Sequence, residues 1–291
     1  MISDTAVLKK LAKIKEIATL SEVIHEVLTA LASDESSAQD LAVILSKDQA
    51  LCAKVLKIAN SAFFAQSRRI LDIDSAIVLL GFDSIAQLAL ATSVFNAFGR
   101  GRTHARFDIY GFWEHSIATA IGAKDIAETL HRNADRKVAY TAGLLHDIGK
   151  LVLLIHFPEE YGPVLHQLDS EGMFLHGAEQ SILGFTHCDV GEWLFNRWNY
   201  PERLVQAVAR HHNTLLPEPE PDFVVGAVRL ADLLSNRMHI GASGNTLVPP
   251  LEPNECLIIG LDETKLVEVE QKLESAARGI TRVLQAMTER R

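Results

Sequence analysis

The run AYTAGLLHDIGKLVLLIHF, residues 139–157, is almost entirely apolar except at its centre, where it carries an imidazole, a carboxylate and an ammonium. These groups belong to His146, Asp147 and Lys150. Burying them together costs several kcal/mol unless they are paired or bound to something. A cation removes that cost, because His146 and Asp147 lie about 100° apart on a helix and can flank one metal from two sides. Lys150, one turn later, would then point at whatever the metal holds.

The alternative that needs no metal is a buried ion pair between Asp147 and Lys150, with a hydrogen-bonded His146 beside it. Other residues of the ligand type favour the metal, because each stands in an apolar helical context. They are His115, His187, the pair His211 and His212, and Asp232.

Imidazole and carboxylate without thiolate form the ligand set of iron, manganese, zinc or cobalt, and hold too much nitrogen for magnesium or calcium alone. Three or four of these residues complete one site, and the rest could hold a second ion bridged by Asp147, at a usual separation of ~3.5–4 Å. We expect one or two divalent transition-metal ions, iron or manganese favoured, with zinc, cobalt or nickel as alternatives. Such a pair activates water and clamps phosphoryl oxygens. Asp147 and Lys150 are therefore the candidate catalytic residues, Lys150 adding charge at the transition state.

Other histidines and one cysteine are weaker candidates for metal ligands, or are not expected to be ligands. His212 is ambiguous, since adjacent histidines on a helix cannot both face one site equally well. Cys188, beside His187, is expected in the core. The remaining histidines lack a matching partner pattern and are expected at the surface or in local hydrogen bonds: His25, His104, His131, His156, His166, His176 and His239.

Composition excludes several classes of protein. The chain has 291 residues, 48% hydrophobic and 22% charged, which is typical of a globular protein that forms a core. Its three cysteines are few and far apart, which indicates reduced thiols in the cytoplasm. A net charge of −9 disfavours nucleic acid as the partner but tolerates a metal-held phosphate or nucleotide. The N-terminus lacks the pattern of a signal peptide, and no apolar run reaches the length and apolarity of a membrane span.

Proline and glycine are distributed so that the chain is predicted to be all-α. The first 157 residues contain no proline, and only Gly81 interrupts the first 98. Ser36 with Gln39, Asp48, and Asp72 or Asp74 mark helix starts, and Gly81 marks a helix end. A continuous helix is expected over 136–157, ended by Pro158. The glycine- and arginine-rich segment 99–106 is the best candidate boundary, a linker or alternatively an anion contact, so we expect domains 1–99 and 100–291.

The sequence resembles a known family in two parts. His115, HDIGK at 146–150 and Asp232 match the H…HD…D pattern of the HD superfamily of metal-dependent phosphohydrolases. LAVILSKDQALCAKVLKIANSAFF and IDSAIVLLGFDSIAQLALATSVFNAF are similar to the HDOD family, the HD-related output domain of bacterial signalling proteins. The resemblance covers roughly residues 17–212. It implies an N-terminal helical subdomain packed on an HD-like helical domain, and a regulatory role through other signalling proteins.

Two functions follow from this resemblance. Many HDOD members have lost HD ligands and are considered non-enzymatic, whereas this sequence keeps them and has His187, His211 and His212 at positions similar to those of the second metal in HD-GYP phosphodiesterases. It departs from HD-GYP at Asn213, with no glycine-tyrosine-proline element. We therefore favour a signalling module with a retained metal site, acting through protein or ligand interaction. The alternative is an active metal-dependent phosphohydrolase, a phosphodiesterase of a nucleotide or cyclic nucleotide.

Overall fold

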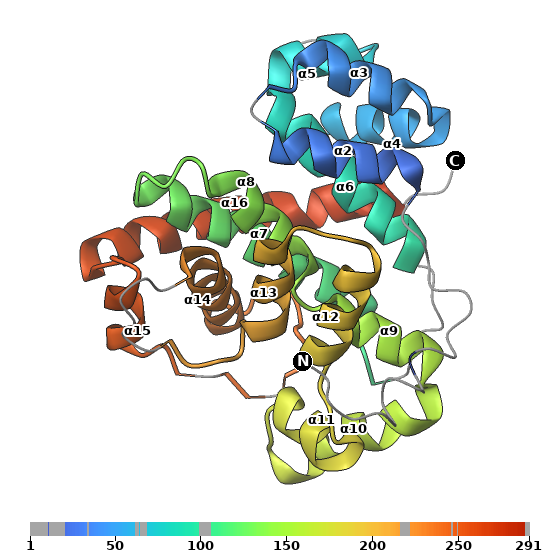
Figure 1. Cartoon of the computed structure of the whole chain (residues 1–291). Helices are drawn as coiled ribbons and strands as arrows, with labels where there is room; N and C mark the ends of the chain where they lie inside the picture. The colour runs from blue at the N-terminus through green and yellow to red at the C-terminus, as the bar shows by residue number, and fades with distance from the viewer. Residues whose placement is uncertain are drawn as a thin grey trace. The chain divides into compact units, whose positions relative to one another are not determined.

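The computed structural model of this chain describes residues 11, 21–33, 35–61, 64, 69–98, 106–215, 222–245, 247–248 and 250–288. Every regular element in these ranges is a helix, and the described residues include no strand (Figure 1). The predicted all-α class is therefore confirmed. Most of the segment 99–106 and of the proline-rich segment 216–222 lies outside the described residues, as does His104.

The helices belong to two compact units. One unit lies in Ala18–Arg100 and Ala276–Arg291, the other in Gly101–Ser275 with the first 17 residues. The chain was predicted to divide once, at 99/100. In the structure, a second boundary between the two compact units lies inside the last helix, after Ser275. The first unit contains α2 (Glu22–Ala32), α3 (Ala38–Ser46), α4 (Gln49–Ala59), α5 (Ile73–Leu80) and α6 (Phe82–Phe98).

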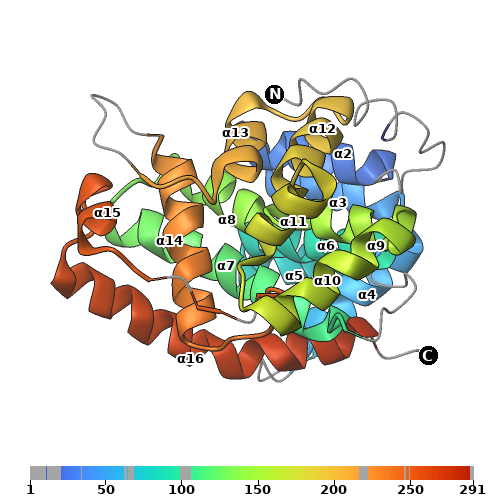
Figure 2. The same ribbon diagram turned by 90° about the horizontal axis from the view of Figure 1, so that it is seen from below.

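The second unit contains the remaining helices: α7 (Ile109–Thr129), α8 (Arg136–Leu145), α9 (Ile148–His156), α10 (Pro158–Glu171), α11 (Leu175–Leu183), α12 (His187–Arg197), α13 (Glu202–Arg210), α14 (Phe223–Arg237), α15 (Pro253–Ile258) and the first half of α16 (Glu263–Thr288), whose second half belongs to the first unit. Helix α7 packs against α8 and α14, and α12 packs against α9 and α13. Figure 2 shows α7, α8 and α14 side by side, with α12 and α13 beyond them. All predicted metal ligands lie in this second unit.

Helix starts in the first unit follow local capping chemistry. The capping box of α3 is formed by Ser37 and Asp40, one residue later than the predicted Ser36 and Gln39. The shift has a simple cause, since a serine hydroxyl and a carboxylate three residues apart satisfy each other's backbone N–H groups, and Asp40 is the stronger acceptor. Asp48 caps α4 as predicted, accepting a backbone N–H of the first turn at 2.9 Å.

Helix α5 and the core complete this unit. Asp72, not Asp74, caps α5, and Gly81 ends it with a φ of 87°, a conformation that favours glycine. The core is built from apolar helix faces. Among the described residues of this unit, only Gln87 and Thr92 are polar and buried. Hydrophobic burial therefore holds this unit together with little polar content.

The predicted continuous helix over 136–157 is wrong in its middle. Helix α8 ends at Leu145 and α9 begins at Ile148, so His146 and Asp147 form the junction between them. Asp147 has φ −99° and ψ 7°, outside the α region, and this interrupts the helical hydrogen-bond ladder. The stretch Arg136–His156 is long and apolar enough to cross a membrane, contrary to expectation, but 89% of its most apolar window is buried, as in a core helix.

Candidate metal centre

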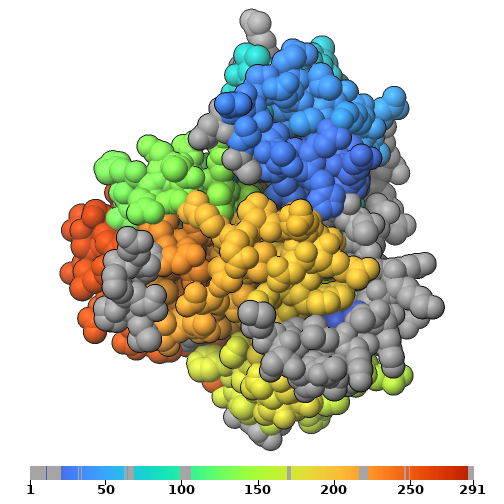
Figure 3. Space-filling view, in the orientation of Figure 1, coloured from blue at the N-terminus to red at the C-terminus, as the bar shows by residue number. Residues whose placement is uncertain are grey.

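Six helices or their ends bring the seven predicted ligand residues together. His115 lies within α7, His146 and Asp147 lie at the α8–α9 junction, His187 opens α12, His211 and His212 follow α13, and Asp232 lies within α14. All except His212 are at most 3% exposed. On the face drawn in Figure 3, side chains of α12 and α13 (gold) form a continuous surface. The convergence was predicted, and the role of these residues as ligands stays a prediction.

Asp147 lies between two sets of imidazoles. Its Oδ2 is 3.2 Å from Nε2 of His146. Its Oδ1 is 3.2 Å from Nε2 of His187 and 3.5 Å from Nε2 of His211. Each carboxylate oxygen therefore faces its own nitrogen ligands. This is the arrangement of a carboxylate that bridges two metal positions.

The first position is framed by His115, His146, Asp147 and Asp232. Asp232 Oδ1 is 2.9 Å from Nε2 of His115 and 3.8 Å from Nε2 of His146. Two ligands bound at ~2.1 Å from one ion lie about 3.0–3.4 Å apart, so this spacing fits a shared metal. Within the described part of the chain, Nδ1 of His115 and Nε2 of His146 are buried without hydrogen-bond partners. Buried orphaned nitrogens are costly, and a metal would satisfy those facing the position.

The tautomers of two histidines are set by backbone carbonyls. Nδ1 of His146 lies 2.7 Å from the carbonyl oxygen of Gly143, and Nδ1 of His211 lies 2.8 Å from that of Val208. A carbonyl only accepts, so each Nδ1 must carry its proton and donate it. The lone pair of each Nε2 is then directed at the carboxylates. This is the neutral imidazole form that binds a metal.

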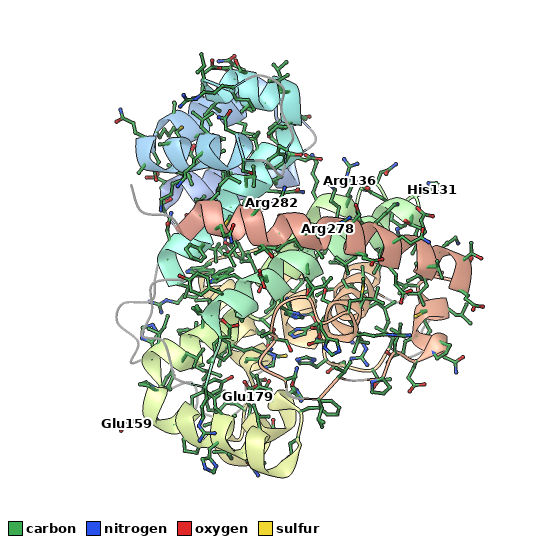
Figure 4. All side chains as sticks on the ribbon, turned by 180° about the vertical axis from the view of Figure 1, so that it is seen from behind. His131, Arg136, Glu159, Glu179, Arg278 and Arg282 are labelled. Atoms are coloured by element: carbon green, nitrogen blue, oxygen red, sulfur yellow. The ribbon has the colours of Figure 1, made fainter. Side chains whose placement is uncertain are left out.

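His187 is oriented by Glu179, which sequence reasoning missed. Nδ1–H of His187 donates to Glu179 Oε2 at 2.6 Å, and the His187 backbone N–H donates to the same oxygen at 2.9 Å. Tyr161 donates its hydroxyl hydrogen to Oε1 at 2.6 Å. Glu179 (labelled in Figure 4) lies on α11, eight residues before His187 and in another helix, so no spacing rule could reveal it. A carboxylate behind an imidazole is the usual support of a histidine ligand.

Lys150 is held inside the same cluster. Its ammonium donates to Asp147 Oδ2 at 2.5 Å and to the carbonyl oxygen of Ser243 at 2.9 Å. Ser243 donates to Asn236, which donates to Asp232 Oδ1 at 2.8 Å. The ion pair proposed as the metal-free alternative is therefore present, but it uses only one oxygen of Asp147 and leaves the imidazoles facing the carboxylates. The ion pair therefore leaves room for a metal at the imidazole nitrogens.

Local charges keep the carboxylates ionised. Burial alone would raise the pKa of Asp147, but His146 and Lys150 hold it well below its ordinary value. Burial likewise opposes ionisation of Asp232, yet His115 lowers its pKa to about 2. His187 shows the reverse case, because burial lowers its pKa and the charge of Glu179 raises it well above the ordinary value. Anionic carboxylates in a buried site are suited to a cation.

Glycines allow the helices that carry ligands to approach closely. A Cβ on Gly149 of α9 would lie 2.0 Å from the carbonyl oxygen of His187 at the start of α12. A Cβ on Gly143 of α8 would lie 2.8 Å from backbone atoms of α7, the helix of His115. A Cβ on Gly191 of α12 would lie 2.4 Å from a methyl group of Val208 on α13. Small residues therefore set the distances between the ligand helices.

The second position is framed by Asp147 Oδ1, His187 and His211, and three further side chains lie beside it. His212 Nε2 is 3.1 Å from His187 Nε2, and Cys188 Sγ is 3.9 Å from both ring nitrogens of His211. Cys188 is buried, as expected of a core residue, but it also belongs to this cluster. His176, expected at the surface or in a local hydrogen bond, is half-buried, with its ring centroid 5.2 Å from that of His212. Its position next to the site was missed.

Comparison with known proteins places these features in a family. The chain is similar to the crystal structure of an HDOD domain protein of unknown function from Geobacter sulfurreducens, with a TM-score of 0.82 at 24% identity over 98% of this chain and 99% of that one. A candidate phosphohydrolase from Shewanella amazonensis gives a TM-score of 0.75 at 21% identity, over 99% of this chain and 100% of that one. These likenesses show the fold.

Two other matches are longer than this chain. A candidate signal-transduction protein from Marinobacter aquaeolei gives a TM-score of 0.82 at 22% identity, covering 97% of this chain and 65% of that one. An uncharacterised protein from Treponema pallidum is 25% identical over 223 residues, which is 76% of this chain but 42% of that protein. The HDOD domain model matches residues 17–214. On that match, which covers more than half of the sequence, this chain belongs to the HDOD family.

Proposed function

We propose that this HDOD protein is a signalling module whose chemical core is a buried metal centre with two positions. The observation that carries the proposal is Asp147, whose two oxygens each face a separate set of imidazole nitrogens. We assign a divalent transition metal, iron or manganese first and zinc, cobalt or nickel as alternatives, because the donors are imidazole and carboxylate. The Marinobacter protein, described as a candidate signal-transduction protein, supports the regulatory role.

Burial of the ligands favours signalling over turnover. His146 and His187 are 0% exposed, and Asp147 is 1% exposed. Ions held at the two positions would together contact residues of six helices or their ends, so their presence would change the packing of the unit as a whole. Metal occupancy is therefore coupled to the stability of the fold that other signalling proteins would recognise.

Phosphoester hydrolysis is the second candidate. It is favoured by the pairing of Lys150 with Asp147 beside a two-position site, because such sites activate water and Lys150 could neutralise phosphoryl charge. A further neighbour, from Shewanella amazonensis, is described as a candidate metal-dependent phosphohydrolase, with a TM-score of 0.56 at 18% identity. Against it stands the second contact of Lys150, since Asp147 and the Ser243 carbonyl together take two of the three hydrogens of its ammonium.

Elemental analysis of untagged protein purified without added metal tests the proposal. We expect about two equivalents of metal in the wild type and a loss in His146→Ala. His156→Ala, on α9 but outside the cluster, is the matched control and should keep the metal. Wild-type protein that folds without any metal, even after metal is supplied, would end the metal proposal. Turnover of a phosphoester that His146→Ala and Asp147→Ala both abolish would replace signalling with catalysis.

A further inference from the structure

The second metal position has two possible sets of donors. His187 Nε2 and His211 Nε2 are common to both sets, since the Nδ1 of each donates to another group. One set is completed by Asp147 Oδ1, an oxygen donor. The other is completed by Cys188 Sγ and His212 Nε2. The choice between them decides which metal the position holds.

We propose that Cys188 is a metal ligand, and that His187, Cys188, His211 and His212 hold zinc(II) in a tetrahedral site. This inference rests on the proposed metal centre and deepens it, because it assigns the four donors of the second position and leaves Asp147 as a ligand of the first position only, facing the second without bridging to it. Zinc binds thiolate and imidazole donors in tetrahedral sites.

The distances within the cluster fit a tetrahedral ion. Bonds of ~2.0–2.1 Å to nitrogen and ~2.3 Å to sulfur place two nitrogens about 3.4 Å apart and a nitrogen and a sulfur about 3.6 Å apart. The structure has 3.1 Å between His187 Nε2 and His212 Nε2, and 3.9 Å between Cys188 Sγ and His211 Nε2. One donor atom from each of the four residues lies within 4.8 Å of the others. The two histidine nitrogens therefore already have the spacing of shared ligands, whereas Cys188 Sγ, equally far from both ring nitrogens of His211, must move towards the Nε2 lone pair to complete the site.

Cys188 is placed to act as an anion. It is the second residue of α12, after the N-cap Thr186, so its side chain belongs to the helix turn where unpaired backbone N–H groups favour negative charge. It is 4% exposed, and its sulfur lies equally far, 3.9 Å, from both ring nitrogens of His211. On binding, the thiol would release its proton and the sulfur would donate to the ion.

Adjacent ligand pairs explain why His212 belongs to this set. His187 and Cys188 are consecutive at the start of α12, and His211 and His212 are consecutive after α13. Two consecutive residues at a helix end can both bind one ion, whereas the set completed by Asp147 uses only His187 and His211. The HD pattern thus accounts for the donor set that contains Asp147, and the two adjacent pairs account for the set that contains Cys188 and His212.

Cobalt(II) substitution tests the assignment. We expect wild-type protein loaded with cobalt(II) to show a near-ultraviolet sulfur-to-cobalt charge-transfer band and the intense visible bands of a tetrahedral ion. Cys188→Ser should lose the charge-transfer band, and Cys256→Ser, with a cysteine buried to a similar degree outside the cluster, should keep it. Bound cobalt without that band, or a band that survives in Cys188→Ser, would overturn the thiolate ligand.

Two measurements keep this test separate from that of the metal centre itself. Cobalt content measured on the same samples shows whether any ion binds, and protein that takes up no cobalt would count against both the thiolate ligand and the proposed function. If Cys188→Ser fails to fold by circular dichroism, X-ray absorption of the zinc-loaded wild type decides the question. A zinc–sulfur distance of about 2.3 Å supports the thiolate, and a shell of nitrogen and oxygen alone refutes it.

Discussion

The two compact units are stabilised in different ways. In the described part of Ala18–Arg100, two polar residues are buried, Gln87 and Thr92. In the described part of Gly101–Ser275, sixteen polar or charged residues are buried, and the metal cluster is among them. Apolar burial alone can hold the first unit. The second buries charges that destabilise it unless they neutralise one another or bind an ion, so its stability depends on chemistry as well as packing.

The largest effect is expected from Asp147→Ala in metal-depleted protein. This change leaves the Lys150 ammonium buried with only the Ser243 carbonyl as a partner, and it removes the anion that faces three imidazoles. We expect a loss of about 3–5 kcal/mol in the free energy of unfolding. Urea denaturation in a chelator measures it. A loss below 1 kcal/mol, roughly the scale of a surface pair, would show that the second unit tolerates unpaired buried charge.

A smaller loss is expected from Gly149→Ala. The new Cβ would lie 2.0 Å from the carbonyl oxygen of His187, so α9 and α12 must separate. We expect about 1–3 kcal/mol of destabilisation and a lower metal content, measured by thermal unfolding and elemental analysis.

The matched control for that change is Gly177→Ala in α11, where the nearest neighbour of a Cβ is the end of the Met173 side chain at 3.8 Å. Alanine fits there without strain, so the control should gain about 0.4–1 kcal/mol. Equal effects of the two substitutions would show that helix spacing in the second unit is not set by Gly149.

Glu179→Gln should weaken metal binding without removing a ligand. The amide is nearly isosteric but neutral, so it no longer fixes the His187 ring as a carboxylate does. We expect a 10–100-fold lower affinity at the second position, measured by competition with a chromophoric chelator. Affinity at the first position is the internal control. An unchanged affinity would mean that His187 needs no carboxylate behind it.

Asp125→Asn tests how the burial of a carboxyl group that is not a predicted metal ligand affects the stability of the second unit. Burial, with Glu128 nearby, raises the pKa of Asp125 from 3.8 to about 6 in the folded protein. The ionised form is therefore disfavoured by folding, and stability is lost as pH rises from the unfolded value towards 6. The variant should melt higher than wild type at about pH 7 and equally near pH 4, in scans of metal-free protein. A constant difference between the two pH values would contradict this.

The smallest effect is expected in the first unit, from Asp72→Ala. The side chain of Asp72 caps α5 by accepting the backbone N–H of Ser75 at 2.7 Å. Losing that cap should cost about 1 kcal/mol, independent of metal. Denaturation with and without metal checks it. A cost that appears only in the metal-loaded protein would show that the two units are not stabilised separately.

The sequence predicted the helical class and the residues that converge. His115, His146, His187 and Asp232 could be found because a histidine or carboxylate inside an apolar helical run is costly unless it has a use. The predicted helix over 136–157 failed at its centre, because the apolar pattern there continues through a junction where Asp147 leaves helical angles. Periodicity reports burial, and it carries no sign of a local break in the backbone.

Other features could not be predicted, for different physical reasons. Glu179 and Ser243 act on the site from loops and helices that only the tertiary fold brings near, one on His187 and one on Lys150. His176 joins the edge of the site in the same way. Gly149 was visible in the sequence as a missing side chain, but the carbonyl that requires it, at 2.0 Å from a Cβ, belongs to a helix 38 positions later.

The first metal position joins residues far apart in the chain. His115 and Asp232 share it, and they are 117 positions apart in the sequence. An ion bound to both would close a loop of that length and would act as a reversible cross-link, stabilising the protein because it binds the folded chain and not the unfolded one. Removing the ion would reopen the whole loop at once. The protein then becomes easier to unfold over most of that unit, and proteolysis should report the loss along its length.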